Sequence, residues 1–263
     1  MTQIVGVGLY RDEDIFVERV VRNVAEFCDE LLLFDHRSRD GTGEILRKLA
    51  AEFPHARFEA IADPSISHDR LRPFIATDAW VFGVDGDELF DPERLRSFRP
   101  RLLGGEFDDW WLIRSNALHV VELDEGSRTA RGYMAPPAPS NVKLHNFALI
   151  ESWDGVHRQR LHGEEGLRFK PGREARKLEL GKRYSWDDSP LRCLHVCFLR
   201  RSSRELVDTG RLNISELTAP ARLPVRAWRR LRGRQPRWKA EHYREGPLQV
   251  ASAEPFLTPS NGG

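Results

Sequence analysis

The stretch VFGVDGDELFDP, residues 81–92, indicates most about how the chain folds. Its apolar start, residues 81–84, is typical of the end of a buried strand. Three acidic side chains follow directly: Asp85, Asp87 and Glu88. Asp91 and Pro92 then predict the start of a helix, because aspartate caps helix N-termini and proline is favoured at the first helical position. The stretch therefore predicts a buried strand, an acidic turn and a helix in direct succession.

Apolar runs and helical patterns alternate over the first part of the chain. Four apolar runs predict buried strands: residues 4–9, 30–35, 56–61 and 79–85. Helical spacing occurs at residues 14–28 and again after the second strand, where Asp40 or Thr42 would cap the helix. A third helix is expected around residues 66–78, started or interrupted by Pro73. This order predicts an α/β fold with a Rossmann-like, mostly parallel sheet and helices on both faces, followed by a less regular region.

Polar clusters follow the carboxyl ends of three predicted strands. They are YRDED (residues 10–14), DHRSRDG (35–41) and DGDE (85–88). Parallel sheets bind ligands at the carboxyl ends of their strands, so we expect the three clusters to line one crevice. In an extended segment, Asp85 and Asp87 would project to the same side and converge on one cation. Their carboxylates suit Mg²⁺ or Mn²⁺, which commonly join protein acids to substrate phosphates.

Two simpler interpretations compete with such a site. An isolated D-x-D is more often a solvated turn before a helix cap, but the two other polar clusters at the same edge favour a ligand site. The GVG at residues 6–8 could begin a dinucleotide fingerprint, with Asp35 as the ribose-binding acid. Position 11 is arginine where the third glycine belongs, which argues against a nicotinamide enzyme.

The segments VGLYRDEDIFVERVVRNVAEFCDELLLFDHRSRDGTGEILRKLA and ATDAWVFGVDGDELFDP resemble the nucleotide-sugar-binding half of family 2 glycosyltransferases with the GT-A fold. The resemblance covers residues 3–98 as an ordered set of motifs. It implies a GT-A-type sheet and an enzyme that moves a sugar from a nucleoside-diphosphate sugar, the donor, to an acceptor hydroxyl with inversion. A divalent metal, Mn²⁺ or Mg²⁺, would stabilise the charge of the departing diphosphate.

The resemblance also implies roles for single residues. Asp12 and Glu13 match the Asn-Glu pair at the rim of the nucleoside pocket, with Asp12 in place of the usual asparagine. Asp35 matches the acid that hydrogen-bonds the base. Asp85 is expected near the ribose and the metal, and Asp87 on the metal. The residues expected to bind the donor are Leu9, Asp12, Glu13, Asp35, Asp40, Asp85, Gly86 and Asp87.

The second half resembles one branch of the same family, which has a W-x-G-x-hydrophobic-H-E motif and, later, a strand that ends in histidine and leads into a helix. The matching stretches are VKLHNFALIESWDGVHRQ, which contains Lys143, and LRCLHVCFLRRSSRELVDTGRLN. Arg158 replaces the motif's glutamate. If that glutamate is the base elsewhere, its local substitutes Asp154 and His157 are the expected catalytic residues.

His195, at the end of the second stretch, has three open interpretations. It could be an ordinary buried residue packed behind the site. It could complete the coordination shell of the metal that binds the donor. The metal ligands would then be Asp85, Asp87 and His195. It could also bind zinc with Cys193 and Cys197 from one face of a strand, although no fourth ligand is apparent.

Composition sets the expected cellular context. The 263 residues are 40% hydrophobic, and 41 basic against 40 acidic residues give no general bias toward nucleic acid or membranes. Three scattered cysteines make no disulfide framework, and no run approaches the roughly 20 apolar residues that span a bilayer. We expect a cytoplasmic protein with a donor-binding half (1–125), an acceptor-binding and catalytic half (126–220) and a basic extension (221–263).

The extension contains a basic segment, residues 222–239, with eight basic residues, two tryptophans and no acid. It could be a solvated face, a peripheral contact with the inner face of an anionic membrane, or a binding site for a donor or acceptor phosphate. No nucleic acid partner is expected. The expected acceptor is a small molecule, a glycolipid or a polysaccharide. The last residues, 251–263, are predicted to be a loose terminus.

Two alternatives to an active glycosyltransferase stay open. The first is a non-catalytic module that binds sugar nucleotides or glycans, motivated by Arg158 in place of the base. The second is a nucleotidyltransferase, which would also hold a metal with acids at a sheet edge. Such enzymes usually carry a glycine-rich basic loop after the first strand, and the acidic GLYRDED argues against this class.

Overall fold

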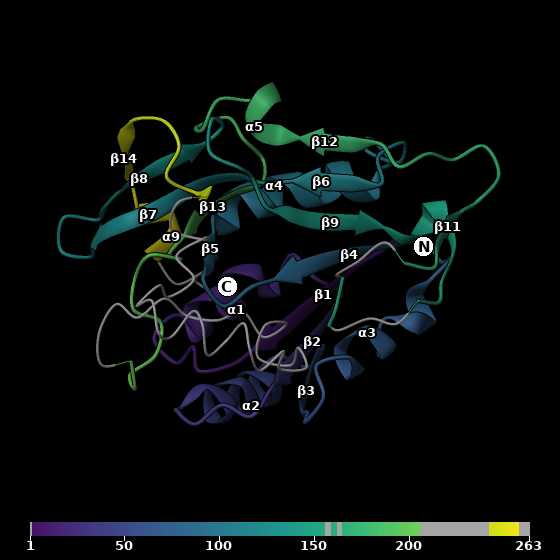
Figure 1. Ribbon diagram of the computed structural model, residues 1–263, viewed down its shortest axis with the longest axis horizontal. Helices are drawn as coiled ribbons and strands as arrows, with labels where there is room; N and C mark the ends of the chain where they lie inside the picture. The colour runs from purple at the N-terminus through teal and green to yellow at the C-terminus, as the bar shows by residue number, and fades with distance from the viewer. Residues whose placement is uncertain (1, 156–158, 162–164, 206–241, 258–263) are drawn as a thin grey trace, which may run out of the picture.

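The computed structural model describes residues 2–155, 159–161, 165–205 and 242–257. The main sheet of this part of the chain has seven strands (Figure 1). In spatial order they are β12 (Lys177–Glu179), β6 (Leu112–Arg114), β9 (Val142–Asn146), β4 (Ala79–Val84), β1 (Gln3–Tyr10), β2 (Glu30–Asp35) and β3 (Ala56–Ala60). Only β9 runs against the others, pairing antiparallel with β4 and β6. The predicted α/β fold with a mostly parallel sheet is confirmed.

Apolar side chains cover both faces of this sheet. Along β1, Ile4 and Tyr10 belong to one core, whereas Val5, Val7 and Leu9 belong to a second core on the other face. Strands buried on two sides need apolar residues at successive positions, which explains the continuous apolar runs in the sequence. The first core lies under α1 (Val17–Ala25), α2 (Thr42–Glu52) and α4 (Pro92–Leu103). The second lies under α3 (Ile66–Asp69), η1 (Arg72–Phe74), η2 (Phe147–Leu149) and the hairpin of β10 (Ile150–Trp153) and β11 (Leu167–Phe169).

A second sheet of five strands adjoins the first. Its order is β14 (Leu248–Ser252), β8 (Thr129–Ala135), β7 (Asn116–Asp124), β13 (Arg192–His195) and β5 (Glu88–Phe90). The chain leaves β4 in the main sheet, turns through residues 85–87 and enters β5 in the second sheet. The acidic turn predicted from the sequence therefore lies where the two sheets meet. Two short helices complete the described elements: α5 (Leu180–Arg183) and α9 (Glu254–Leu257).

Several predicted element boundaries need correction. The helix expected around residues 66–78 is only the short α3 and η1, because Pro73 lies inside η1 and no longer helix forms around it. The N-cap of α2 is Gly41; Asp40 contributes differently, by accepting hydrogen bonds from the backbone N and hydroxyl of Thr42. The cap of α4 is confirmed, with Asp91 accepting from two backbone N–H groups.

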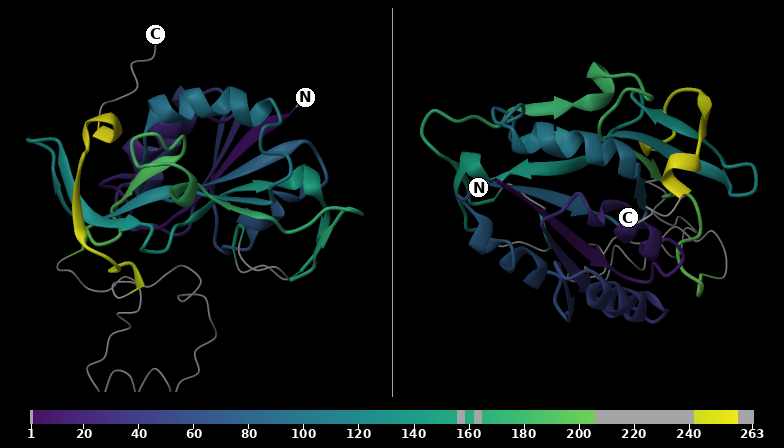
Figure 2. Two further views of the ribbon diagram at one scale, coloured as in Figure 1. Left: turned by 90° about the horizontal axis from the view of Figure 1, so that it is seen from above. Right: turned by 180° about the vertical axis from the view of Figure 1, so that it is seen from behind.

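The C-terminal prediction was wrong for residues 251–257. β14 packs alongside β8 (Figure 2), with which it pairs. The ring of Phe256 is fully buried in the first core. The strand that ends at His195 is confirmed as β13. Residues 196–205 after it are not helical, and residues 206–213, the rest of the stretch expected to contain the following helix, lie outside the described residues. The basic segment 222–239 lies outside the described residues.

The predicted boundary near residue 125 does not divide the main sheet, because β9 and β12 join strands from the first half. The described helices include none that is long and apolar enough to cross a bilayer.

Candidate active site

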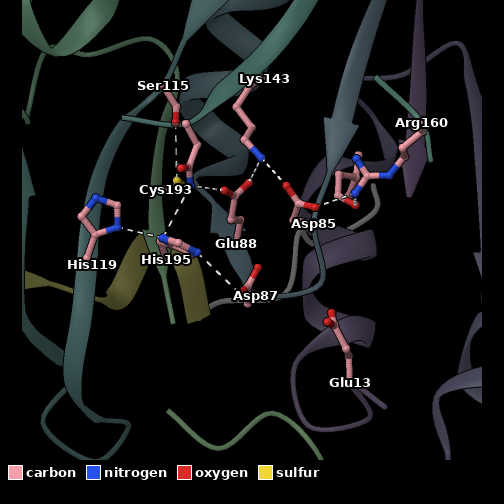
Figure 3. A network of polar contacts seen from close by, with 12 residues as sticks. Glu13, Asp85, Asp87, Glu88, Ser115, His119, Lys143, Arg160, Cys193 and His195 are labelled. Carbon is pink, nitrogen blue, oxygen red and sulfur yellow. Dashed lines mark hydrogen bonds and ion pairs between the residues drawn. The ribbon is translucent and has the colours of Figure 1, made fainter. Parts of the chain in front are cut away.

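The D-G-D-E sequence forms a turn, so the prediction of an extended segment is wrong. The backbone N–H of Glu88 donates to the carbonyl of Asp85 at 3.2 Å, which closes the turn. A Cβ at Gly86 would lie 1.6 Å from Oε2 of Glu13, a residue from the loop after β1. Glycine therefore allows the turn to approach that loop closely. Because of the turn, the side chains of Asp85 and Asp87 contact different partners (Figure 3).

Asp85 is neutralised by two cations. Its carboxylate accepts from Nζ of Lys143 at 2.6 Å and from Nη2 of Arg160 at 2.5 Å. Desolvation within the cluster favours the neutral acid, but Lys143 and Arg160 outweigh it and hold the pKa of Asp85 well below its usual range. Lys143 comes from β9, and its side chain is 2% exposed. Asp85 is therefore charged and paired within the protein.

Glu88 shares Lys143 with Asp85. The ammonium of Lys143 pairs with the Glu88 carboxylate, which also accepts from Nδ2 of Asn141 at 2.6 Å. Burial raises the pKa of Glu88, and the charge of Lys143 offsets this only in part. Glu88 therefore lies behind the turn as a buried acid, with β5 holding it against β9.

Asp87 faces the opposite way, toward β13 and the segment that follows. Oδ2 of Asp87 lies 3.5 Å from Nε2 of His195 and pairs with the guanidinium of Arg201. The backbone N–H of Val196 donates to the Asp87 carbonyl at 2.8 Å, which fixes the end of β13 against the turn. Arg201 also lies 3.6 Å from Oε1 of Glu13. One cation thus links the loop after β1 with the turn after β4.

Two histidine rings lie edge to face beside Asp87. Nδ1 of His119, on β7, lies 2.7 Å from Nδ1 of His195, and Nε2 of His119 lies 2.9 Å from the carbonyl of Pro139. Nε2 of His119 donates to the Pro139 carbonyl, so its Nδ1 accepts and Nδ1 of His195 is the donor between the two rings. Burial opposes the charge on His195, but Cys197 and Asp87 outweigh burial and raise its pKa to about 10. Burial and the neighbouring His195 lower the pKa of His119 to about 3. The proton therefore resides on His195.

Cysteines lie on both sides of this pair. Sγ of Cys197 and one ring nitrogen of each histidine lie within 4.8 Å of one another, whereas Cys193 is buried with its sulfur 3.8 Å from the Ser115 hydroxyl. The two cysteines predicted with His195 as a zinc set thus have different surroundings. Tyr243 stacks on His119 with 4.3 Å between ring centroids.

The other two polar clusters meet at the ends of β1 and β2. Oδ1 of Asp12 accepts from the backbone N–H of Arg39 at 2.7 Å, and the backbone N–H of Glu13 donates to the Thr42 hydroxyl at 2.7 Å. Asp40 accepts from the hydroxyl of Ser202 at 2.6 Å. Together with the Arg201 link, these contacts bring all three predicted clusters to one edge of the sheet.

Asp35 and Leu9 occupy contrasting positions. Asp35 is 8% exposed; its Oδ2 accepts from the Ser38 backbone N–H at 3.3 Å, and its buried Oδ1 makes no hydrogen bond within the described residues. The side chain of Leu9 instead packs in the second core, one residue before the end of β1. Asp35 therefore has a carboxylate oxygen available to a ligand, whereas Leu9 could contact one through its backbone.

The predicted catalytic residues lie in the least regular part. Asp154 is 64% exposed and lies near Arg72 and Arg168, at 3.9 and 3.8 Å. Trp153 beside it is buried among aromatic rings. His157 lies outside the described residues. The structure shows no contact between Asp154 and the acidic turn among the described residues, so both assignments stay predictions.

Sequence reasoning missed four polar residues of this site: His119, Asn141, Arg160 and Arg201. Arg160 and Arg201 are two of 41 basic residues, and neither stands at a position that the quoted motifs specify. His119 lies in a strand that looks like ordinary core. Each is brought to the turn by an element distant in sequence, so spacing along the chain could not have identified it.

The arrangement fits a divalent cation at Asp87 and His195. A carboxylate oxygen and an imidazole nitrogen face each other there, and both suit Mn²⁺ or Mg²⁺ chemistry when phosphate oxygens complete the shell and Nε2 of His195 has released its proton. Asp85 fits this role less well, because both of its oxygens already accept from Lys143 and Arg160.

No protein-family model matches the chain, and no curated protein matches it. Among solved structures, it is similar to glucosyl-3-phosphoglycerate synthase from Mycobacterium tuberculosis in complex with Mn²⁺, UDP-glucose and phosphoglyceric acid, at 21% identity and a TM-score of 0.34, covering 44% of each chain. A second match is 4-diphosphocytidyl-2C-methyl-D-erythritol synthase from Anaerococcus prevotii, at 10% identity and a TM-score of 0.33, covering 56% of this chain and 70% of that one. A third is HddC from Yersinia pseudotuberculosis, at 12% identity and a TM-score of 0.35, covering 67% and 88%. The chain spans less than half the length of the first of these proteins, and similarity at this level assigns no function.

Proposed function

We propose that this protein is a metal-dependent glycosyltransferase that moves a sugar from a nucleoside-diphosphate sugar to an acceptor hydroxyl, with inversion. The observation that carries the proposal is the acidic turn between the two sheets. Its second acid, Asp87, faces His195, and its glycine brings it against Glu13 at the end of β1. Carboxylates and cations come together at this edge, where a bound diphosphate would contact them. A turn that is only solvated would not require such an arrangement.

The nucleoside would lie toward the ends of β1 and β2. Asp35 offers a buried carboxylate oxygen that could accept from a base N–H, because Oδ1 makes no hydrogen bond within the described residues. Asp12, Glu13 and Asp40 lie in the loops that follow the same two strands and are held there by the contacts described above. Asp85, fixed by Lys143 and Arg160, would accept from a ribose hydroxyl.

A bound cation would act as a Lewis acid on the departing diphosphate. Asp87 and His195 would hold it, because their facing atoms are 3.5 Å apart. His119 accepts from Nδ1 of His195 and so keeps Nε2 of His195 directed at Asp87. We assign the removal of the acceptor's proton to Asp154 or His157. The acceptor would be a small molecule, a glycolipid or a polysaccharide, and a membrane-borne acceptor would agree with the basic segment 222–239.

Nucleotide binding tests the proposal. Isothermal titration with UDP, GDP and dTDP, each with and without Mn²⁺, should show at least one nucleotide that binds more tightly with the metal. Asp87→Asn should weaken that metal-dependent binding by about tenfold or more, the loss of roughly 1.4 kcal/mol of binding free energy. The matched control is Asp109→Asn, which removes an exposed acid near Arg173 and Arg176 and should bind as the wild type does.

The outcomes separate the remaining classes. If no nucleotide binds, or if Mn²⁺ makes no difference, the donor site does not exist as proposed. Slow hydrolysis of the matching nucleotide sugar would show an active transferase, whereas binding without hydrolysis or transfer would indicate a binding module. Release of pyrophosphate from a nucleoside triphosphate and a sugar phosphate would instead indicate a nucleotidyltransferase.

A further inference from the structure

Three consecutive residues, 201–203, lie across the acid-rich edge of the main sheet; we call them the strap. The hydroxyl of Ser202 donates to Asp40 at 2.6 Å, and Ser203 donates to Asp14 through its backbone N–H at 2.7 Å and its hydroxyl at 2.5 Å. The backbone N–H of Ile15 donates to the Arg201 carbonyl at 3.1 Å. The strap is therefore anchored on the loops after β1 and β2.

Arg201 extends from the strap to the proposed cation site. Its guanidinium pairs with Oδ2 of Asp87, the same oxygen that faces Nε2 of His195, and lies near Oε1 of Glu13. Its side chain is 11% exposed. The charge that a divalent cation would neutralise on Asp87 is thus already neutralised by an arginine.

Two other cations of the site, Lys143 and Arg160, pair with Asp85 and not with Asp87. Lys143 bridges Asp85 and Glu88 from within a sheet strand. Arg160 bonds Asp85 and the Val84 carbonyl, and its backbone N–H donates to the Ser67 hydroxyl at 2.9 Å. Arg201 differs in its acid partner, because it pairs with Asp87, the acid that faces His195 at the proposed cation site.

Electrostatics favours a change of partner when the donor binds. A divalent cation on Asp87 repels a guanidinium at the same carboxylate, because like charges a few ångströms apart interact strongly where water is limited. A diphosphate brings several negative charges to the same place. Its oxygens suit the planar fork of arginine, which binds phosphate through two parallel N–H bonds.

We propose that Arg201 exchanges partners during donor binding, an inference that rests on the proposed function. In the nucleotide-free protein it neutralises Asp87 and Glu13. When a nucleoside diphosphate and its cation bind, Arg201 leaves Asp87 to the cation and binds the diphosphate. Arg201 then has two opposite effects: it weakens binding of the cation alone and strengthens binding of diphosphates relative to monophosphates.

Two binding measurements on Arg201→Ala test this exchange. Electron paramagnetic resonance of Mn²⁺ without nucleotide should show several-fold tighter binding than in the wild type. Calorimetry with Mn²⁺ should show the preferred nucleoside diphosphate bound about tenfold more weakly, with the monophosphate little changed. Arg201→Lys, which keeps the charge but not the fork, should keep weak Mn²⁺ binding and lose part of the diphosphate affinity. Arg204→Ala is the matched control, because Arg204 is an exposed arginine of the same segment.

The outcomes distinguish the exchange of partners from a purely structural role of Arg201. If Arg201→Ala remains folded by circular dichroism but weakens Mn²⁺ and diphosphate binding together, or changes neither, the exchange is wrong and the proposed function stands. If it weakens monophosphate as much as diphosphate, Arg201 does not contact the diphosphate. If the wild type binds no nucleoside diphosphate, the proposed function fails and the exchange fails with it.

Discussion

At the scale of single residues, the acidic turn is stable because each of its acids pairs with at least one cation. Lys143 and Arg160 neutralise Asp85, and Arg201 pairs with Asp87. Removing one partner of a buried pair leaves an uncompensated charge, so these cations also stabilise the fold. The proton on His195 adds to the same balance, because it faces Asp87. The site can therefore bind a further cation or lose one of the cations that it holds.

The charge on His195 predicts a pH dependence of stability. Its pKa in the folded protein is raised from 6.5 to about 10, so the folded state keeps a proton that the unfolded chain releases. The resulting stabilisation is fully present below about pH 6.5 and is lost as the pH rises toward 10. Urea unfolding of the wild type and of His195→Gln, compared between pH 6 and pH 10, should give a difference in free energy of unfolding that shrinks as the pH rises. A difference that stays constant over this range would contradict the assignment of the proton to His195.

At the scale of elements, the entry into α4 shows one residue with two roles. Oδ1 of Asp91 accepts from the backbone N–H groups of Glu93 and Arg94, as the Asp-Pro pair predicts. Oδ2 of Asp91 accepts from Arg192 on β13 at 2.8 Å, a contact that the sequence does not indicate. The cap therefore also fixes α4 to the second sheet, next to the strand that carries His195.

Two substitutions of Asp91 should separate these roles. Asp91→Asn keeps an acceptor for the cap but leaves Arg192 without its buried partner, and should lower the free energy of unfolding by about 3 kcal/mol. Asp91→Ala also removes the cap and should cost about 1 kcal/mol more. Asp187→Asn is the matched control, because Asp187 pairs with the same Arg192 but is 89% exposed; its effect should stay below about 1 kcal/mol. Equal effects of Asp91→Asn and Asp187→Asn in urea unfolding would show that burial does not matter at this pair.

At the scale of the whole molecule, the C-terminal residues complete the fold begun by the first ones. The side chain of Asn23, on α1, donates to the carbonyls of Phe90 and Phe256. The ring of Phe256 is fully buried next to Trp186, and β14 forms the edge of the second sheet (Figure 2). The end of the chain thus holds together α1, β5 and the second sheet, which is also where the acidic turn lies.

Because the C-terminal residues pack into the first core, a substitution of a buried residue there should destabilise the whole domain. Phe256→Ala should lower the free energy of unfolding by about 3–5 kcal/mol, the usual cost of a large buried ring. Val250→Ala, at a position 69% exposed in β14, should change it by less than about 1 kcal/mol. Urea unfolding followed by tryptophan fluorescence and by circular dichroism measures both. A loss at Phe256 confined to one probe would show that the C-terminal segment unfolds separately.

The sequence by itself determined the four neighbouring parallel strands of the main sheet, the helices α1, α2 and α4, and the position of the acidic turn. These depend on local patterns: apolar runs for strands buried on both faces, helical spacing, and an Asp-Pro cap. Only the tertiary structure decided how the acids are partnered. Four side chains of the site come from distant segments: Lys143 from β9, Arg160 from an irregular segment, Arg201 from the strap and His119 from β7. The closure of the turn itself separates Asp85 from Asp87. Such contacts depend on which distant segments meet in space, which periodicity along one chain does not encode.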